Sequence, residues 1–545
     1  MAGVETNWFE DDVALREAAA RLLGKRYAAA EPYLREMGRL AAGPLDTLAR
    51  EADANPPVLV PYDREGTRID EIRHHPSYRE MERIAYGFGL VGLKRDERFL
   101  ASFGPYRAVL KFSLGYLFSQ AEAGLYCPVC LTDGTLFVLD RHDPELARRF
   151  GPRLAAMDRD GLQQGAMFLT EIQGGSDVGA TLTAARREAD GTWRLTGEKW
   201  FCSNASAELA LVLARPEGAP PGTRGLALFL VPRTRPDGTR NSLVVRRLKD
   251  KLGTRSMATA EIGFEGALGY LVGRADKGFA YMTDMLNLSR LYNAAASAAC
   301  LRRAYREATL RARTREAFGE RIDRYPLVRR TLVRMAVEAE ANLLAVLDAA
   351  AATDAAEFEK DERADLVARL LTPVVKAYTA ECAIRAASQA LEILGGNGYV
   401  EEWVTPRLFR DAQVLPIWEG TANILSLDLL RAIFRERAWP PFLSHLAARA
   451  GERTKGLVDR LAAAGDSVLS ASEAERALLC RSLLERAART HQAVLLEDRA
   501  RAAGEREARV LEIYLDEWSE ERFSPGRLAA LSYETVCGEE ISRAP

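Results

Sequence analysis

Residues 210–231 read ALVLARPEGAPPGTRGLALFLV, two short apolar runs joined by a segment rich in Gly and Pro. The two runs, Ala210–Ala214 and Leu226–Val231, have a length and composition that favour strands over helices. The Pro and Gly residues between them predict a turn. This stretch therefore predicts β structure in the middle of the chain.

Similar runs continue on both sides, from about Ala166 to about Gly278. They are separated by short turns with no helical periodicity between them, so we expect a central antiparallel β domain, a sandwich or barrel, over residues 166–278. No Rossmann domain is implied. The other predicted strands are Thr192–Leu195, Lys199–Cys202, Ser242–Val245 and Ala260–Phe264.

Helical periodicity marks both flanks of this β domain. Residues 1–165 are predicted to form an N-terminal helical domain, as in Asp11–Leu23 and Asp143–Phe150, interrupted by the Pro-rich and therefore extended stretch Asn55–Gly66. Long amphipathic segments in residues 279–440 predict a C-terminal four-helix bundle. These segments are Met282–Arg313, Leu327–Ala352, Asp361–Leu394 and Asn423–Arg437.

A Trp-Pro-Pro sequence at 439–441 predicts the end of the bundle. Residues 441–545 are predicted to form an additional helical domain, with helices over Ser472–Arg489 and Gln492–Trp518. The predicted fold is thus mainly α with a central antiparallel β domain.

Composition and charge are those of a soluble globular protein, with 48% hydrophobic and 28% charged residues and a net charge of −2. This excludes a uniformly basic nucleic-acid binder. We find neither a secretory signal nor an apolar stretch of about 20 residues, and so expect a cytoplasmic protein without a membrane span.

The seven cysteines are expected to be free thiols, as is usual in a reducing compartment. Cys127 and Cys130 lie close together, but no second pair of Cys or His at metal spacing accompanies them. We interpret them as packing residues at a helix start and expect no metal site. A redox pair or half a zinc site is the alternative.

The strongest local motif is Pro416–Asn423 (PIWEGTAN), at the entrance to a predicted helix. Glu419 follows an apolar run, and an apolar wall raises the pKa of a carboxyl and makes it a better base near neutral pH. The alternative is that Glu419 or Thr421 only caps the helix.

Three weaker motifs accompany it. Leu169–Val178 (LTEIQGGSDV) predicts a tight turn whose amides and hydroxyls can face a phosphate or a flavin edge. Arg315–Gly319 (REAFG) offers an Arg and an aromatic residue that could grip a pyrophosphate. Leu394–Tyr399 (LGGNGY) has more glycines than a helix cap needs. Each of these, taken alone, is also compatible with an ordinary turn or a solvated loop.

In this order and spacing the four motifs resemble the acyl-CoA dehydrogenase superfamily over about residues 80–440. The chain looks most like its AidB-type branch, the alkylation-response flavoproteins, and the two ends extend that likeness to nearly the whole chain. Support for the branch comes from Ala121–Gly124 leading into Cys127-Pro128, Lys199–Phe201, Leu248–Gly253, Ile417–Gly420, Asn55–Pro57 and Tyr62-Asp63.

The resemblance implies an FAD-dependent enzyme in which Glu419 removes the α proton of an acyl thioester while the flavin takes a hydride from the β carbon. Reduced FAD would be reoxidised by an electron-transfer flavoprotein. In some relatives the base comes from a position that aligns with Ser289, which cannot serve, so the role falls on Glu419.

The resemblance also implies a set of FAD-binding positions in this chain. In the β region these are Leu169, Thr170, Gly175, Ser176, Phe201, Cys202 and Ser203, and after the base they are Thr421 and Asn423. Arg315, Phe318, Gly395 and Gly396 match residues that reach the FAD of a neighbouring subunit, which implies a homo-oligomer, a dimer of dimers (homotetramer). Arg255–Thr259 lacks the Ser-x-Thr pattern of typical members, and Glu392 replaces a common Gln.

Two other functions stay open. AidB-type proteins are associated with duplex DNA binding through a basic C-terminal domain, but residues 441–545 hold 15 Lys and Arg against 18 Asp and Glu. We therefore favour a structural or oligomerisation role for this segment. The other function is a flavin oxidase on the same scaffold, which the sequence does not separate from a dehydrogenase.

Overall fold

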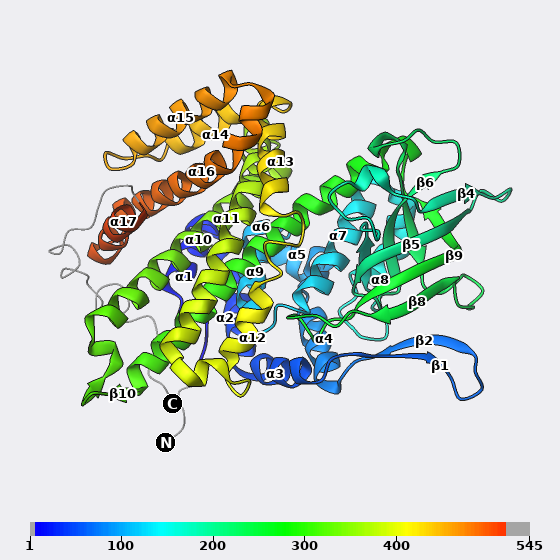
Figure 1. Ribbon diagram of the computed structural model, residues 1–545, viewed down its shortest axis with the longest axis horizontal. Helices are drawn as coiled ribbons and strands as arrows, with labels where there is room; N and C mark the ends of the chain where they lie inside the picture. Colours follow the sequence, from blue (N-terminus) through cyan, green and yellow to red (C-terminus); the bar gives the residue numbers. More distant parts are fainter. Residues whose placement is uncertain (1–5, 519–545) are drawn as a thin grey trace. The chain divides into compact units, whose positions relative to one another are not determined.

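The computed structural model describes residues 6–518, and its contacts divide this part of the chain into two compact units. The first unit comprises residues 6–43, 107–121 and 290–518 and is built of helices (Figure 1). The second unit comprises residues 44–106 and 122–289 and contains the barrel strands. The predicted fold class is confirmed. The four domain boundaries stay a prediction, and residues 519–545 of the last domain lie outside the described part.

The strands of the second unit close into a barrel. Hydrogen-bonded pairs run β6–β7, β7–β9, β9–β5, β5–β4 and β4–β6, so the last pair returns to the first strand. Two further strands pair with members of this ring: β3 pairs with β6, and β8 pairs with β9. The strands are β3 Gly165–Phe168, β4 Ala184–Arg187, β5 Trp193–Ser203, β6 Leu209–Pro216, β7 Ala227–Pro232, β8 Leu243–Leu248 and β9 Thr259–Leu271.

The barrel differs from the prediction in two respects. The pairs β3–β6 and β4–β6 are parallel and the others antiparallel, a distinction that the alternation of apolar residues does not report. The two predicted runs over 192–202 form the single strand β5, which continues through Gly197. A side chain at Gly197 would lie 2.6 Å from the Cα of Thr183, so a glycine is needed at this crossing.

Outside the barrel, the second unit contains a hairpin and further helices. The Pro-rich stretch leads into the antiparallel pair β1 Val58–Tyr62 and β2 Arg68–Arg73, which the sequence analysis read only as extended. The helices of this unit are α3 Asp46–Ala54, α4 Pro76–Phe88, α5 Glu97–Phe103, α7 Tyr126–His142 and α8 Pro144–Leu154. Cys127 and Cys130 are free thiols in the first turns of α7.

The first unit is organised around the long helix α11, which packs against α10, α12, α13 and α16 (Figure 1). The predicted bundle segments are all helical. Their observed bounds are α9 Gly278–Thr314, which enters this unit at Arg290, α10 Pro326–Phe358, α11 Glu362–Leu394 and α13 Ala422–Phe434, with α12 Val404–Ala412 before α13. The helices α1 Val13–Leu23, α2 Tyr27–Leu40 and α6 Ala108–Ala121 complete the unit on the N-terminal side.

The C-terminal extension forms α14 Trp439–Ala447, α15 Lys455–Ser470, α16 Glu473–Ala502 and α17 Glu505–Trp518. The predicted break near residue 490 is wrong, because α16 runs through it to Ala502. Its buried polar side chains at that point find partners: the Gln492 amide donates to Asn342 Oδ1 at 2.9 Å. Between residues 6 and 518, no helix combines the length and the apolar character that a bilayer span requires.

Candidate active site

The Glu419 motif forms a strained turn between α12 and α13. Glu419 has φ +58° and Gly420 has φ +102°, two consecutive residues in the left-handed region. Glycine adopts this region freely, whereas for Glu it costs about 1–2 kcal/mol. Such a residue persists only where its surroundings hold it, and strained residues of this kind cluster at functional sites.

Two buried cations hold the carbonyl oxygens of this turn. Arg290 of α9 donates from Nε to the Glu419 carbonyl at 3.1 Å, and Lys376 of α11 donates from Nζ to the Gly420 carbonyl at 2.8 Å. Arg290 is also paired with Asp428 Oδ2 of α13 at 2.7 Å, and Arg369 contacts the same carboxylate at 2.8 Å. Side chains of α9, α11 and α13 therefore hold the backbone of the turn in place.

The Glu419 carboxyl itself is left free to react. Its Oε2 atom is enclosed and meets no hydrogen-bond partner among residues 6–518. Burial raises the pKa of Glu419 to about 7, against the opposing pull of the positive charges on Arg290 and Lys376. A carboxyl with a pKa near neutrality is suited to take a proton from carbon.

The capping alternative for this motif is not supported. Thr421 stands at the N-cap position of α13, but its side chain makes no capping hydrogen bond. Thr421 and Asn423 are exposed at the start of the helix, beside Glu419. Their polar groups, together with the positive end of the helix, are available to an anionic or polar ligand.

The first predicted FAD positions come together in the barrel unit. The Trp200 amide donates to the Thr170 carbonyl at 2.8 Å, which joins the Leu169–Thr170 turn to the strand that carries Phe201 and Ser203. Phe201 is 56% exposed, so its ring is accessible to a planar ligand. Cys202 points into the barrel core, so only its main chain could reach a cofactor.

A buried ion pair braces this turn. Lys199 Nζ contacts Glu171 Oε1 at 2.8 Å and the Leu169 carbonyl at 3.0 Å. Burial would raise the pKa of Glu171, but Lys199 and the Thr183 hydroxyl hold it at about 2. A Cβ added at Gly175 would lie 2.5 Å from Thr170 Oγ1, so the Thr170 side chain would have to move to make room for it, and the neighbouring Ser176 is exposed.

A third group of predicted positions lies at one end of the helical unit. The Arg315 guanidinium lies against Gly395, where an added Cβ would be 3.0 Å from Nη1. Phe318 sits in the tight turn of a short hairpin with φ +54° and is 98% exposed. Gly396 is exposed one residue further along the chain. Of these four positions Phe318 and Gly396 are exposed, and Arg315 and Gly395 are half-buried.

Lys376 is the residue of this site that the sequence analysis missed. It is fully buried in α11, within the apolar stretch Leu370–Tyr378. A single charge inside an apolar helical run is the available signal, because Lys is almost never fully buried without a partner. Its partner, however, lies 44 residues further along the chain and cannot be read from the pattern.

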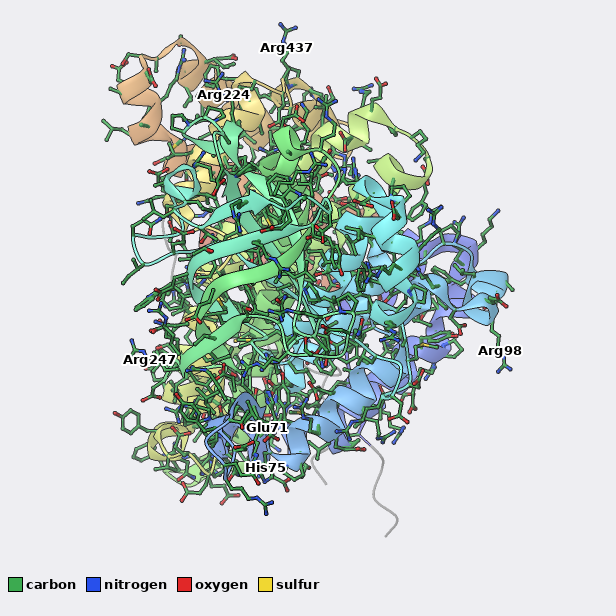
Figure 2. All side chains as sticks on the ribbon, turned by 90° about the vertical axis from the view of Figure 1, so that its right-hand side faces the viewer. Glu71, His75, Arg98, Arg224, Arg247 and Arg437 are labelled. Carbon is green, nitrogen blue, oxygen red and sulfur yellow. The ribbon has the colours of Figure 1, made fainter. Side chains whose placement is uncertain are left out.

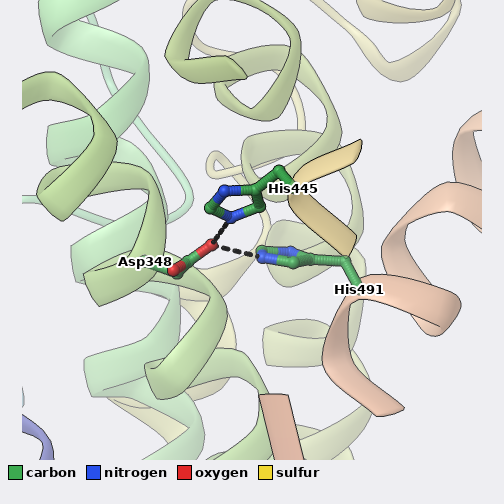
Figure 3. A group of neighbouring side chains, drawn as sticks. All are labelled: Asp348, His445 and His491. Carbon is green, nitrogen blue, oxygen red and sulfur yellow. Dashed lines mark hydrogen bonds and ion pairs between the residues drawn. The ribbon is translucent and has the colours of Figure 1, made fainter. Parts of the chain in front are cut away.

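One other cluster has the residue types of a metal centre. His445 and His491 Nε2 lie 2.7 and 2.8 Å from the same oxygen of Asp348 (Figure 3). These spacings are shorter than the roughly 3.3 Å between ligands of a tetrahedral zinc ion with bonds of about 2.0 Å. Arg449 also hydrogen-bonds to Asp348 and lies 2.9 Å from His445 Nε2. We therefore interpret the cluster as a hydrogen-bonded link between α10, α14 and α16.

Comparison with family models covers most of the chain. Residues 276–434 match the acyl-CoA dehydrogenase C-terminal domain, and residues 166–267 match the middle domain. Residues 2–161 match the N-terminal domain of the adaptive response protein AidB.

Related proteins give the same result. The chain is 37% identical over 399 residues to AidB of Escherichia coli, covering 71% of each protein. It is 34% identical over 438 residues to acyl-CoA dehydrogenase family member 11 of Caenorhabditis elegans, covering 78% of this chain and 70% of the relative.

Solved structures resemble the whole fold. Caenorhabditis elegans ACDH-11, solved in complex with C11-CoA, superposes with a TM-score of 0.88 at 28% identity, covering 97% of this chain and 96% of that one. An acyl-CoA dehydrogenase from Bacillus anthracis, complexed with FAD, gives a TM-score of 0.69 at 19% identity, over 84% and 86% of the two chains. The second likeness concerns the fold alone.

Proposed function

Because the chain belongs to the acyl-CoA dehydrogenase family, we propose that it is an FAD-dependent oxidoreductase that forms an α,β double bond in an acyl thioester. Glu419 is the base that removes the α proton. The observation that carries this proposal is the Glu419 carboxyl, which has a pKa near 7 and whose enclosed Oε2 has no hydrogen-bond partner in the described part of the chain.

The chain's own residues supply the proton transfer and the positioning. The α C–H bond breaks as its proton moves to the Glu419 carboxylate, and the electron pair left behind forms the double bond as hydride leaves the β carbon. When bound, FAD supplies the acceptor for that hydride. Arg290 and Lys376 keep the turn in one conformation, so little reorganisation is needed for the reaction.

The barrel unit has features that fit FAD. In the barrel, the turn braced by Lys199 presents backbone groups beside the accessible Phe201 ring, and a side chain at Gly175 would collide with Thr170. We infer that Leu169, Thr170, Ser176, Phe201, Ser203 and the main chain of Cys202 hold one part of FAD. Thr421 and Asn423 offer further polar contacts at the start of α13.

The substrate class follows from the relatives. ACDH-11 was solved with C11-CoA, and we propose that this chain also takes an acyl-CoA or another acyl thioester. The electrons would pass to an electron-transfer flavoprotein. The chain length and branching of the acyl group would depend on side chains of several helices.

We also propose that the protein is a homo-oligomer, a dimer of dimers. The support is the match of Arg315, Phe318, Gly395 and Gly396 to family positions that reach a neighbouring subunit, together with the 98% exposure of Phe318. These four residues would contact the FAD of a neighbouring subunit. Light scattering of the purified protein tests the assembly, and a monomer would contradict it.

Duplex DNA binding, the other role associated with AidB-type proteins, has less support. Arginines of the C-terminal helices are paired with carboxylates: Arg481 with Glu381, and Arg506 with Glu340 at 3.0 Å. Exposed arginines do project from the surface, Arg437 among them (Figure 2). A gel-shift titration at low and rising salt decides this, because phosphate binding must weaken with salt.

The main proposal is tested by adding a series of acyl-CoA thioesters to the purified, flavin-loaded protein without oxygen. The flavin absorbance should bleach with the correct thioester in the native protein. It should bleach at least 100-fold more slowly in Glu419→Gln, since general acid–base catalysis contributes about 10²–10⁴-fold. Glu402→Gln, at an exposed position before α12, is the matched control. Equal bleaching rates for Glu419→Gln and the native protein would refute the assignment of the base.

A further inference from the structure

Lys376 is a fully buried lysine that reaches the backbone of the Glu419 turn and not its carboxylate. Within the described residues, the ammonium group makes one hydrogen bond, to the Gly420 carbonyl at 2.8 Å, and no ion pair. Burying an ammonium ion costs several kcal/mol, whereas Met or Leu would fill the same space without that cost. Packing alone therefore does not account for a lysine here.

We propose that Lys376 is a positioning residue for the Glu419 base, which it serves by fixing the Glu419–Gly420 turn through the Gly420 carbonyl and by placing a positive charge near the carboxyl without pairing with it. This inference rests on the proposed role of Glu419. It adds a second residue to the machinery of proton abstraction.

The hydrogen bond determines the direction of the carboxyl. Glu419 and Gly420 are both left-handed, so each peptide plane of the turn is rotated away from its usual orientation. Arg290 holds one of the two carbonyls and Lys376 holds the other. Without Lys376 the Gly420 carbonyl would lose its partner, and the turn would be held from one side only.

The charge of Lys376 acts on the ionisation of Glu419. The charged groups that face Glu419 are Arg290 from α9 and Lys376 from α11. Arg290 forms an ion pair with Asp428 of α13, which Arg369 of α11 also contacts, and its charge still lowers the pKa of Glu419 more than the charge of Lys376 does. Lys376 has no such partner in the described part of the chain. It is therefore a second cation near the base, one whose charge no ion pair among residues 6–518 takes up.

The pKa of Lys376 is suited to this role. Burial, together with the positive charge of Arg290, lowers it to about 7, against the opposing effect of the negative charges of Glu419 and Glu381. Lys376 is therefore about half charged at pH 7, mostly charged below it and mostly neutral above it. The two groups titrate in the same range, and each favours the charged form of the other.

Two variants separate the hydrogen bond from the charge. Lys376→Met has a similar volume but neither donor nor charge, and Lys376→Gln keeps a shorter N–H donor without the charge. Lys455→Met, at an exposed lysine of α15, is the matched control. Two readouts are needed: hydrogen–deuterium exchange of the peptide 416–425, and the pH dependence of flavin bleaching by the acyl thioester found active with the native protein.

We expect faster exchange of the peptide in Lys376→Met than in the native protein and the control, with Lys376→Gln between them. In both Lys376 variants the midpoint of the pH profile should rise by about one unit, the lower end of the effect of one nearby charge. Bleaching would then fall about fivefold at pH 7 and hardly at all at pH 9.

The proposal is overturned if the Lys376 variants change neither the hydrogen–deuterium exchange of the peptide nor the midpoint of the pH profile. It is also overturned if the bleaching rate falls equally at every pH, because that result indicates a general structural defect. If Lys376→Met does not fold, Lys376→Gln alone decides through the midpoint. If no thioester bleaches the native protein, the proposed reaction fails, and the exchange measurement still decides whether Lys376 holds the turn.

Discussion

The pKa of Glu419 predicts that flavin reduction by an acyl thioester increases strongly across neutral pH. Only the ionised carboxylate can take the α proton. With a pKa of about 7, roughly one tenth of the carboxyl is ionised at pH 6 and roughly nine tenths at pH 8, so the rate should rise up to about tenfold. An ordinary Glu is almost fully ionised at pH 6 and would give a flat profile.

The assay is anaerobic stopped-flow bleaching of the flavin at a saturating thioester concentration, from pH 5.5 to pH 9. Because Lys376 releases its own proton near pH 7, its charge decreases as Glu419 ionises, which broadens the rise. Photochemical reduction of the same samples is the control, since it does not use the base. A thioester-dependent rate that is constant between pH 6 and pH 8 would refute the assignment of this pKa to the catalytic carboxyl.

Three further predictions concern stability. Because the pKa of Glu419 is raised in the folded state, the free energy of unfolding falls as pH rises from about 4.5 through about 7. In denaturant unfolding, Glu419→Gln should therefore be more stable than the native protein at pH 8, by up to about 3 kcal/mol, and equally stable at pH 4. Lys199→Met leaves Glu171 buried without its cation and should destabilise the barrel by about 3–5 kcal/mol in thermal unfolding; an unchanged melting temperature would contradict the brace. Asp348→Asn removes the negative charge that Arg449 and the two histidines contact, and it should lower the denaturation midpoint at pH 7. Added zinc should not raise the melting temperature of the native protein.

The barrel could be predicted from the sequence because its strands are short and apolar, but their directions could not. β3 and β4 are only four residues long and were missed, and both form the parallel pairs with β6. Their pairing is decided by contacts between segments far apart in the chain. A pattern of alternating side chains reports burial and not the direction of a neighbouring strand.

The C-terminal helices show the same limit. The sequence predicted two helices, Ser472–Arg489 and Gln492–Trp518, where α16 is continuous through Thr490 and His491. In the folded chain these residues are buried: His491 Nε2 donates to the Asp348 carboxylate of α10, and Gln492 accepts from Tyr514 of α17 at 2.8 Å. Partners on other helices replace the water that a loop would have offered.

The site was predicted where one motif carries its chemistry and missed where the chemistry comes from elsewhere in the chain. Glu419, Thr421 and Asn423 lie in one octapeptide, so their proximity follows from the sequence. Lys376 reaches the same turn from α11. Only the packing of α11 against α13 brings it there.

The chain contains two buried pairs of Lys and Glu, and the comparison between them explains why one Glu can be a base. Lys199 contacts the Glu171 carboxylate directly at 2.8 Å, and the pKa of Glu171 falls to about 2 despite its burial. Such a carboxylate is a weak base. Lys376 instead donates to the Gly420 carbonyl, and the pKa of Glu419 stays at about 7. An ammonium group that is held by the backbone can orient a carboxylate and partly stabilise its charge without removing its affinity for a proton.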